Sequence, residues 1–558
     1  MSQTARILRK WWLTVPGVLL LLLLLAVGFL VFRSRGIEER TRQWVVQTLS
    51  QRFQSDVDLD AIHIKVFPQL SVAGDGLTLH HHGRRDVPPL IHIKRFTFTA
   101  GVWELLHPIK HIPLLHVENM VINIPPRVPK NVQPSPPESS NKESSNHESR
   151  NNKSRNNESR KNELASRVVV DEIVCDNTDI VIIPKKVGVQ PLDWDIHDLV
   201  LDSVGRDKPF AFRAHLTNGK PIGEIATLGQ FGPWDADVPG DSPVSGKYEF
   251  TDADLGPFPG IAGILSSDGK YSGVLSELQV EGHTDTPDFS LDGVGKPISL
   301  RTDFSATVDG TNGDTYLHPV NATLVNSLII AEGSVIRGPE KKGHLITIET
   351  TVPNGRIQDF LSLAINSKKP LMTGPVTIKA TLVIPPGNQR ALEKMIIDGQ
   401  FGVSGAKWSN PALREKLESL SRHGQGKPGD EDFGSSVSDL NGSFHLENGV
   451  IKFLRLKFSV EGAAIDLAGT YALRKGDIDL MGYLRLNAKL SQTMTGTKSF
   501  FLKVIDPFFS KGSAGTVIPI HITGTRDDPV FGVTVFHKTF NRKFSTEQLT
   551  PGNKPSPK

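Results

Sequence analysis

The chain has 558 residues, with 63 lysines and arginines against 60 aspartates and glutamates, a net charge of +3 and one cysteine. This near-neutral charge gives no electrostatic reason to expect a nucleic-acid partner, and a single cysteine excludes an intramolecular disulfide, a cysteine-based zinc site and an iron–sulfur cluster. The length allows three or four ordinary domains or one long repetitive body.

A basic tail at 1–10 precedes the most apolar segment of the chain. No charged residue lies between Trp11 and Phe32, and a helix over this segment would be about 33 Å long, enough to cross a hydrocarbon core of about 30 Å. A cleaved signal peptide is the alternative, but its apolar part normally ends within about 15 residues. We therefore predict an uncleaved transmembrane helix at 11–32. Basic residues flank both of its ends, so charge does not decide its orientation.

The region 33–124 begins with apolar residues at helical spacing from Ile37 to Phe53, which predict an amphipathic helix. From Asp56 onward apolar residues recur at every second position, as in strands with one apolar face. This alternation continues through a central region at 164–400 and a C-terminal region at 401–544. The expected fold is therefore mainly β: a long, twisted and curved antiparallel sheet with a few amphipathic helices. Besides the first helix, helices are predicted at 356–366, 410–424 and 491–509.

Two polar segments interrupt this pattern. The Ser/Asn/Pro-rich insert at 125–163 and the tail at 545–558 are too poor in apolar residues to form a core, which predicts disorder. The flanks of the insert resemble each other 58 positions apart, with Leu115 matching Ile173 and Asn119 matching Asn177. This similarity indicates two copies of a strand–turn–strand unit, with chance likeness of two alternating segments as the alternative.

Motifs for chemistry are weak. The histidines of His80–His82 lead into two arginines, which would oppose a bound cation, so we expect a solvated loop there. Acidic turns such as Asp309–Asp314 lack a complete calcium loop and are expected to be ordinary turns. The glycines of Gly424–Gly429 match GxGxxG only formally, because they follow a helix. Cys175 is expected to be a half-buried structural thiol. We therefore expect no enzymatic activity, no cofactor and no metal.

The apolar side of the strands is the remaining candidate site. It forms either the closed core of a sandwich or an open groove that holds acyl chains, and alternation alone does not distinguish the two. The candidate groove residues are Phe304, Ile378, Leu382, Leu454, Leu456, Phe458, Ile478, Leu480, Leu484 and Leu486.

Both ends of the chain resemble the AsmA-like family of bacterial envelope proteins. At the N-terminus the resemblance covers the anchor, the amphipathic helix and the Leu70–Leu79 strand, although Gln54 and Ser55 stand where many members have glycine. At the C-terminus the matching motifs are Leu440–Phe444, Asn448–Ile451, Leu467–Tyr471, Asp479–Gly482, Asp506–Phe508 and Ile518–Thr525.

This resemblance implies a single-pass anchor in the inner membrane, with the bulk of the chain in the periplasm. It also implies a taco-like β-groove, kinship with repeating β-groove lipid-transfer proteins, and a role in moving phospholipid between membranes and in outer-membrane integrity. The expected partners are the membrane, phospholipid acyl chains and other envelope proteins. The alternative function is an envelope scaffold that acts through protein contacts and regulates protein targeting to, or assembly in, the membrane.

Overall fold

The computed structural model describes residues 38–543 except 52, 54, 66–69, 82–83, 86, 101–109, 127–167, 185–190, 206–207, 236, 259, 292–293, 339–342, 365–367, 388, 410, 429–437, 490–491, 493–514, 526–527 and 536–537. The expected anchor at 11–32, nearly all of the insert, nearly all of the helix expected at 491–509, and the tail at 545–558 lie outside these residues. Within the described part of the chain, no helix has the length and apolar character needed to cross a membrane.

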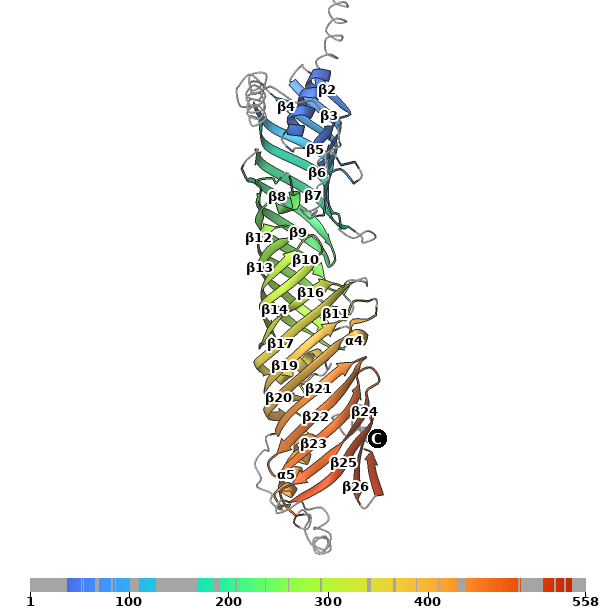
Figure 1. Cartoon of the computed structure of the whole chain (residues 1–558). Helices are drawn as coiled ribbons and strands as arrows, with labels where there is room; N and C mark the ends of the chain where they lie inside the picture. The colour runs from blue at the N-terminus through green and yellow to red at the C-terminus, as the bar shows by residue number, and fades with distance from the viewer. Residues whose placement is uncertain are drawn as a thin grey trace, which may run out of the picture. The chain divides into compact units, whose positions relative to one another are not determined.

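The described residues form a mainly β protein with 27 strands joined in one open, mixed sheet (Figure 1). The chain divides into two compact units, of which unit 1 comprises the residues up to Gly219 together with Glu224–Tyr248 and Tyr271–Ser276, and unit 2 comprises the remainder. β9 (Ile222–Phe231), β10 (Val244–Asp254) and β12 (Ile264–Val274) have residues in both units.

In the part of the chain that the structure describes, eight strands and one α-helix lie wholly in unit 1. The helix covers 38–51, as expected from the spacing of its apolar residues. The strands are β1 (Asp56–Asp58), β2 (Ala61–Lys65), β3 (Leu70–His80), β4 (Ile91–Ala100), β5 (Lys110–Ile124), β6 (Val168–Ile182), β7 (Leu192–Val204) and β8 (Phe210–Gly219). A short 3₁₀ helix, η3, lies at Pro239–Asp241.

One apolar row crosses the sheet of unit 1 from β4 to β8. Its members are opposite one another in register: Phe96, Val117, Cys175, Leu199 and Ala214. Directly opposed residues point to the same face, so these five side chains form one buried core. Val45 and Val46 of the 38–51 helix pack against that core and cover it.

The two similar flanks of the insert are neighbouring parallel strands. β5 and β6 pair so that Leu115 is opposite Ile173 and Val117 is opposite Cys175, the same correspondence that the sequence similarity shows. Asn119 and Asn177 both have left-handed backbone conformations, with φ of 52° and 56°. Each copy is thus one continuous strand with an irregularity at its asparagine, and the expectation of a strand–turn–strand unit is wrong.

The parallel pair also corrects the expected fold class. The sheet is mixed rather than antiparallel, because a strand that returns through a long connection can pair in parallel with the strand before it.

Unit 2 is an antiparallel ladder in which most strands pair with the next strand along the chain. Its strands are β11 (Ile261–Ala262), β13 (Glu277–Leu291), β14 (Val294–Asp309), β15 (Asp314–Leu324), β16 (Ser327–Arg337), β17 (His344–Arg356), β18 (Met372–Thr373), β19 (Pro375–Ile384), β20 (Ile396–Trp408), β21 (Ser438–Glu447), β22 (Val450–Val460), β23 (Ala463–Ala472), β24 (Asp477–Leu486), β25 (Thr516–Thr525), β26 (Pro529–Val535) and β27 (Lys538–Lys543). Its helices are α3 (Ile357–Ala364), α4 (Ala391–Lys394) and α5 (Pro411–Gly424).

The helices α3 and α5 confirm the predictions at 356–366 and 410–424. α5 begins at Pro411, whose fixed φ suits the first helical position, and it ends at Gly424. It packs through Leu420 against Val460, Ala463 and Leu486.

Candidate functional site

The main candidate site is a charge-free face of unit 2, which we call the apolar face. The pairing registers of β19 to β25 place 33 residues on the same side of the sheet. None of them is charged, and only Tyr471 and Thr516 carry a polar side-chain atom. They are Val376, Ile378, Ala380, Leu382, Ile384, Ile397, Gly399, Phe401, Val403, Leu440, Gly442, Phe444, Leu446, Ile451, Phe453, Leu456, Phe458, Val460, Ala463, Ile465, Leu467, Gly469, Tyr471, Ile478, Leu480, Gly482, Leu484, Leu486, Thr516, Ile518, Ile520, Ile522 and Gly524.

The opposite side of the same strands carries their charged residues, which we call the polar side although apolar residues such as Met481 also lie there. On β24, Asp477, Asp479 and Arg485 alternate with the apolar-face positions. Arg485 lies 3.5 Å from Asp466 of β23, an ion pair between two strands on this polar side. One face of the sheet is therefore free of charge, and the other face carries the charged residues.

Many side chains of the apolar face are only half buried. Ile378, Leu382, Phe458 and Leu484 all keep part of their surface exposed. All strands of unit 2 that the structure describes belong to the ladder itself. The described α-helices of this unit are α3, α4 and α5. In this part of the chain there is thus no second sheet to enclose the face, which is what a closed sandwich core requires.

The two longer helices of unit 2 cover only one end of the apolar face. α3 packs through Phe360 and Leu361 on a cluster that contains Val376 and Val403, near the first residues of β19 and the last of β20. α5 packs at the end of β22 and β24, through Leu420. In Figure 1, α5 lies at one edge of the ladder and α4 at the other.

Reciprocal pairs of glycine and phenylalanine flatten the face between β20 and β21. Phe401 is directly opposite Gly442, and Gly399 is directly opposite Phe444. The Phe444 ring lies so close to Gly399 that a Cβ atom there would be 2.6 Å from it, and a Cβ at Gly442 would be 3.0 Å from the Phe401 ring. Because glycine leaves this space, the rings lie against the sheet, with their centroids 6.4 Å apart.

The structure places nine of the ten predicted groove residues on one side of the sheet. Eight of them belong to the apolar face: Ile378, Leu382, Leu456, Phe458, Ile478, Leu480, Leu484 and Leu486. Phe304 lies on β14 opposite Gly282, on the side that continues this face through β15, β16 and β17. Leu480 and Leu486 are buried, whereas the others on the face are half buried.

Leu454 is the exception, and its prediction as a groove residue is wrong. The registers of β22 shift between Phe453 and Leu456, so that Leu454 and Arg455 both lie across from Ala468. This β-bulge changes which alternate positions face the apolar side. Leu454 therefore lies on the polar side, where it is 59% exposed.

Several apolar-face residues were not among the predicted groove residues. Phe401, Phe444 and the isoleucines of β25 lie in the same rows as predicted members. The alternation of these residues was detectable in the sequence. Whether an alternating set extends the face depends on which strands are neighbours in the sheet, and a local pattern does not contain this information.

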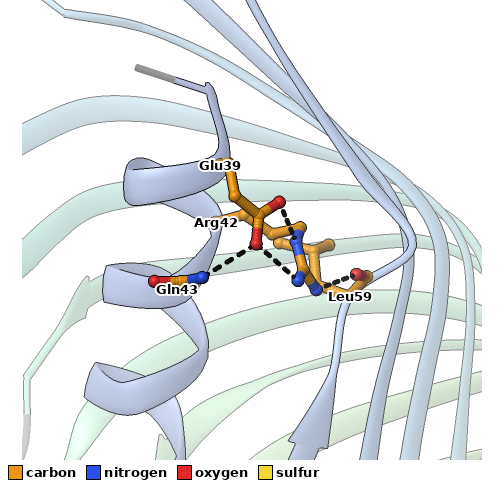
Figure 2. Close-up of polar contacts among 4 residues, drawn as sticks. All are labelled: Glu39, Arg42, Gln43 and Leu59. Carbon is orange, nitrogen blue, oxygen red and sulfur yellow. Dashed lines mark hydrogen bonds and ion pairs between the residues drawn. The ribbon is translucent and has the colours of Figure 1, made fainter. Parts of the chain in front are cut away.

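Unit 1 contains a polar hollow of about 660 Å³ between the 38–51 helix and strands β1 and β3. Most of its ionic groups are already engaged with one another. Arg42 donates hydrogen bonds from Nε and Nη2 to Glu39, at 2.9 and 2.8 Å, and one from Nη1 to the Leu59 carbonyl at 3.1 Å (Figure 2). Gln43 donates another to Glu39, at 2.9 Å. The hydrogen bonds from Arg42, and then that from Gln43, lower the pKa of the exposed Glu39.

These contacts join the 38–51 helix to the segment between β1 and β2. Arg85 likewise pairs with Asp58 of β1 at 2.9 Å. Because most charges of the hollow are paired with one another, we assign it a structural role.

The other residues singled out from the sequence have structural environments. His80 ends β3 and its side chain is 14% exposed, 3.6 Å from Asp58, so the expected solvated loop is wrong at this histidine; His82 lies outside the described residues. Asp309 accepts a hydrogen bond from the Thr311 backbone N–H at 2.9 Å, as in an ordinary turn. Cys175 is 1% exposed rather than half buried, and burial followed by the charge of Asp176 raises its pKa to about 12.

Metal ligation has no support in the part of the chain that the structure describes, where no group of three or more histidine, cysteine or acidic side chains is close enough to hold an ion. Comparisons with known proteins found no matching family model, no matching curated protein and no matching solved structure.

Proposed function

We propose that the apolar face lines a curved, taco-like groove that binds the acyl chains of phospholipids. In this proposal the protein is a non-catalytic β-groove protein that binds phospholipid or helps to move it between membranes, and so supports the integrity of the outer membrane. The observation that carries the proposal is a charge-free face on seven strands, half exposed and without a second described sheet to enclose it.

The physical benefit of such a face is large. Each methylene kept from water is worth about 0.8 kcal/mol, so one acyl chain of roughly 15 methylenes gains on the order of 10 kcal/mol when it lies on an apolar surface. A continuous surface of this kind lowers the barrier for moving a lipid through water without any chemical step.

The proposed location rests on an apolar segment of the sequence and on a family resemblance. The uncharged segment 11–32 would anchor the chain in the inner membrane, and the resemblance to the AsmA-like family supports placing the bulk of the chain in the periplasm. An alkaline-phosphatase fusion at the C-terminus tests this placement, since the enzyme is active only in the periplasm. An inactive fusion would contradict it.

Photo-crosslinking tests the groove in the full chain within its own membrane. A benzoylphenylalanine placed at Leu484 on the apolar face should crosslink to radiolabelled phospholipid. The matched control is Met481 on the same strand, which lies on the opposite side of the sheet and is 64% exposed. Because Met481 is the more exposed of the two, random contact with lipid would favour the control.

The outcomes separate the proposal from the scaffold alternative. Lipid crosslinks at Leu484 that exceed those at Met481 support the groove. Protein crosslinks at Leu484 without lipid would favour an envelope scaffold that acts through protein contacts. Crosslinks to this chain alone, together with unfolding of the Leu484→Lys variant, would favour a closed core.

A further inference from the structure

The strands of unit 2 end along two opposite sides of the sheet, which we call its edges. The two edges are built differently. At one edge the strands are joined by the long connections 357–371, 409–437 and 487–515, and α3 and α5 belong to the first two. At the other edge the connections include the short turns 310–313, 448–449 and 473–476. We call this second edge the turn edge. Among the described residues its connections contain one α-helix, the four-residue α4, whereas α3 and α5 pack on the apolar face at the first edge.

At the turn edge, the last residue of β16 on the same side of the sheet as the apolar face is a cation, Arg337. In the regular pairing of β16 with β17, Val335 is opposite Ile346, and Arg337 is opposite His344 two positions further on. Since side chains alternate between faces, Arg337 and His344 lie on the same side of the sheet as Val335 and Ile346. Ile346 is in turn opposite Ile384 of the apolar face.

The Arg337 side chain is half buried, and the described residues hold no ionic partner for it. Its backbone N–H donates to Asp314, at 2.6 Å, but among the described residues no carboxylate pairs with its guanidinium. Asp314 belongs to the other side of the sheet, because its neighbour Thr315 is opposite Val335. His344 is also half buried; burial, followed by the charge of Arg337, lowers its pKa, and the charge of Asp314 opposes this shift in part. A guanidinium without a carboxylate beside an apolar surface suits a phosphate oxygen, because it can donate two parallel hydrogen bonds.

We infer that Arg337, with His344 beside it, binds the phosphate of a phospholipid whose acyl chains lie on the neighbouring apolar surface. This inference rests on the proposed function and adds a direction to it: the headgroup lies at the turn edge and the chains point toward α3. β17 runs for 13 residues from His344 to Arg356, about 40 Å at ~3.3 Å per residue. An acyl chain spans half of a ~30 Å bilayer core, about 15 Å, and therefore fits between Arg337 and the end that α3 covers.

The test compares two lipids with identical, fluorescently labelled chains: a phospholipid and a diacylglycerol, which lacks the phosphate. Each is titrated into the purified full chain. We expect the wild type to prefer the phospholipid. Arg337→Gln should weaken phospholipid binding about tenfold, which corresponds to ~1.4 kcal/mol, and leave diacylglycerol binding unchanged. Arg337→Lys should retain part of the preference, since lysine keeps the charge without the bidentate geometry.

The matched control is Arg301→Gln, because Arg301 is an exposed cation on β14 opposite Asp285, on the polar side of the sheet. It should leave the affinities for both lipids unchanged. Equal losses for both lipids in Arg337→Gln would indicate a change in packing and overturn the inference. Equal wild-type affinities for the two lipids would also overturn it, while leaving the acyl-chain groove in place.

Two further outcomes identify other origins. If inorganic phosphate alone binds the wild type, is lost in Arg337→Gln, and the two lipids bind equally well, the site takes free phosphate and the headgroup inference fails. If neither lipid binds the wild type, both the proposed function and this inference fail.

Discussion

At the scale of single residues, the glycine–phenylalanine pairs determine how flat the apolar face is. The Gly399→Val substitution should push the Phe444 ring away from the sheet, because a Cβ atom at this position would be 2.6 Å from the ring. Overpacking of this kind typically costs about 1–3 kcal/mol. We expect a lower melting temperature, measured by circular dichroism.

Gly402 provides the control for this substitution. It lies on the same strand but on the opposite side of the sheet, and the contact that a Cβ would meet is the Thr377 hydroxyl, 3.3 Å away. This side chain can rotate, so Gly402→Val should have a much smaller effect. Equal losses in the two variants would show that the rings do not depend on the glycine.

The polar side of the sheet contains a pH-dependent pair. His445 Nδ1 lies 2.7 Å from Asp398 Oδ1, and Glu447 lies 3.7 Å from the other ring nitrogen. The hydrogen bond to Asp398 raises the pKa of His445 above its ordinary value of 6.5. A raised pKa in the folded state means that this stabilisation is fully present below pH 6.5 and is lost as the pH rises through the folded-state value.

The Asp398→Asn variant tests this pair. We expect the difference in melting temperature between wild type and variant to be larger at pH 6 than at pH 8.5, and small in absolute terms because the pair is exposed. A difference that is constant over this range, or larger at pH 8.5, would show that the hydrogen bond does not depend on the protonated ring.

At the scale of elements, a buried carboxylate fixes α3 to the sheet. Asp359 in the first turn of α3 is 6% exposed and accepts hydrogen bonds from the Ser327 hydroxyl, at 2.8 Å, and the Asn326 backbone N–H, at 3.2 Å. Asp359→Ala leaves both donors without this acceptor, which typically costs about 1–3 kcal/mol. Asp359→Asn keeps one acceptor oxygen and should cost less.

Denaturant unfolding, combined with proteolysis near α3, measures this effect. We expect faster cleavage near α3 in Asp359→Ala than in Asp359→Asn. Identical cleavage of both variants and wild type would show that the helix is held by its apolar contacts alone.

Helices and strands could be predicted from the sequence more reliably than the pairing of the strands. The period of two predicted strands such as β24, and the leucine stripe ending at Gly424 predicted α5, because these patterns depend on local geometry. The bulge at Leu454 was not predictable, since one extra residue reverses the alternation without changing the composition. The similarity of β5 and β6 was visible in the sequence, but their parallel pairing was not predicted. Two strands separated by a long insert leave no local signal that they are neighbours in the sheet.

At the scale of the whole molecule, the mainly β class was predictable and the site only in part. Alternation identified an apolar side, and nine of the ten predicted residues lie on it. Alternation did not show whether a second layer covers that side, because covered and uncovered strands alternate in the same way. That question required the pairing of every strand in the ladder, which uses all the described strands of unit 2 for one layer.

The central claim is that the apolar face holds phospholipid, and mass spectrometry of lipid co-purified with the full chain tests it most directly. The account predicts phospholipid in a defined molar ratio with the wild type. This ratio should be reduced in a folded Leu484→Lys variant and unchanged in Met481→Lys, which places the same charge on the opposite side of β24. Wild-type protein without phospholipid, or an equal ratio in all three proteins, would contradict the account.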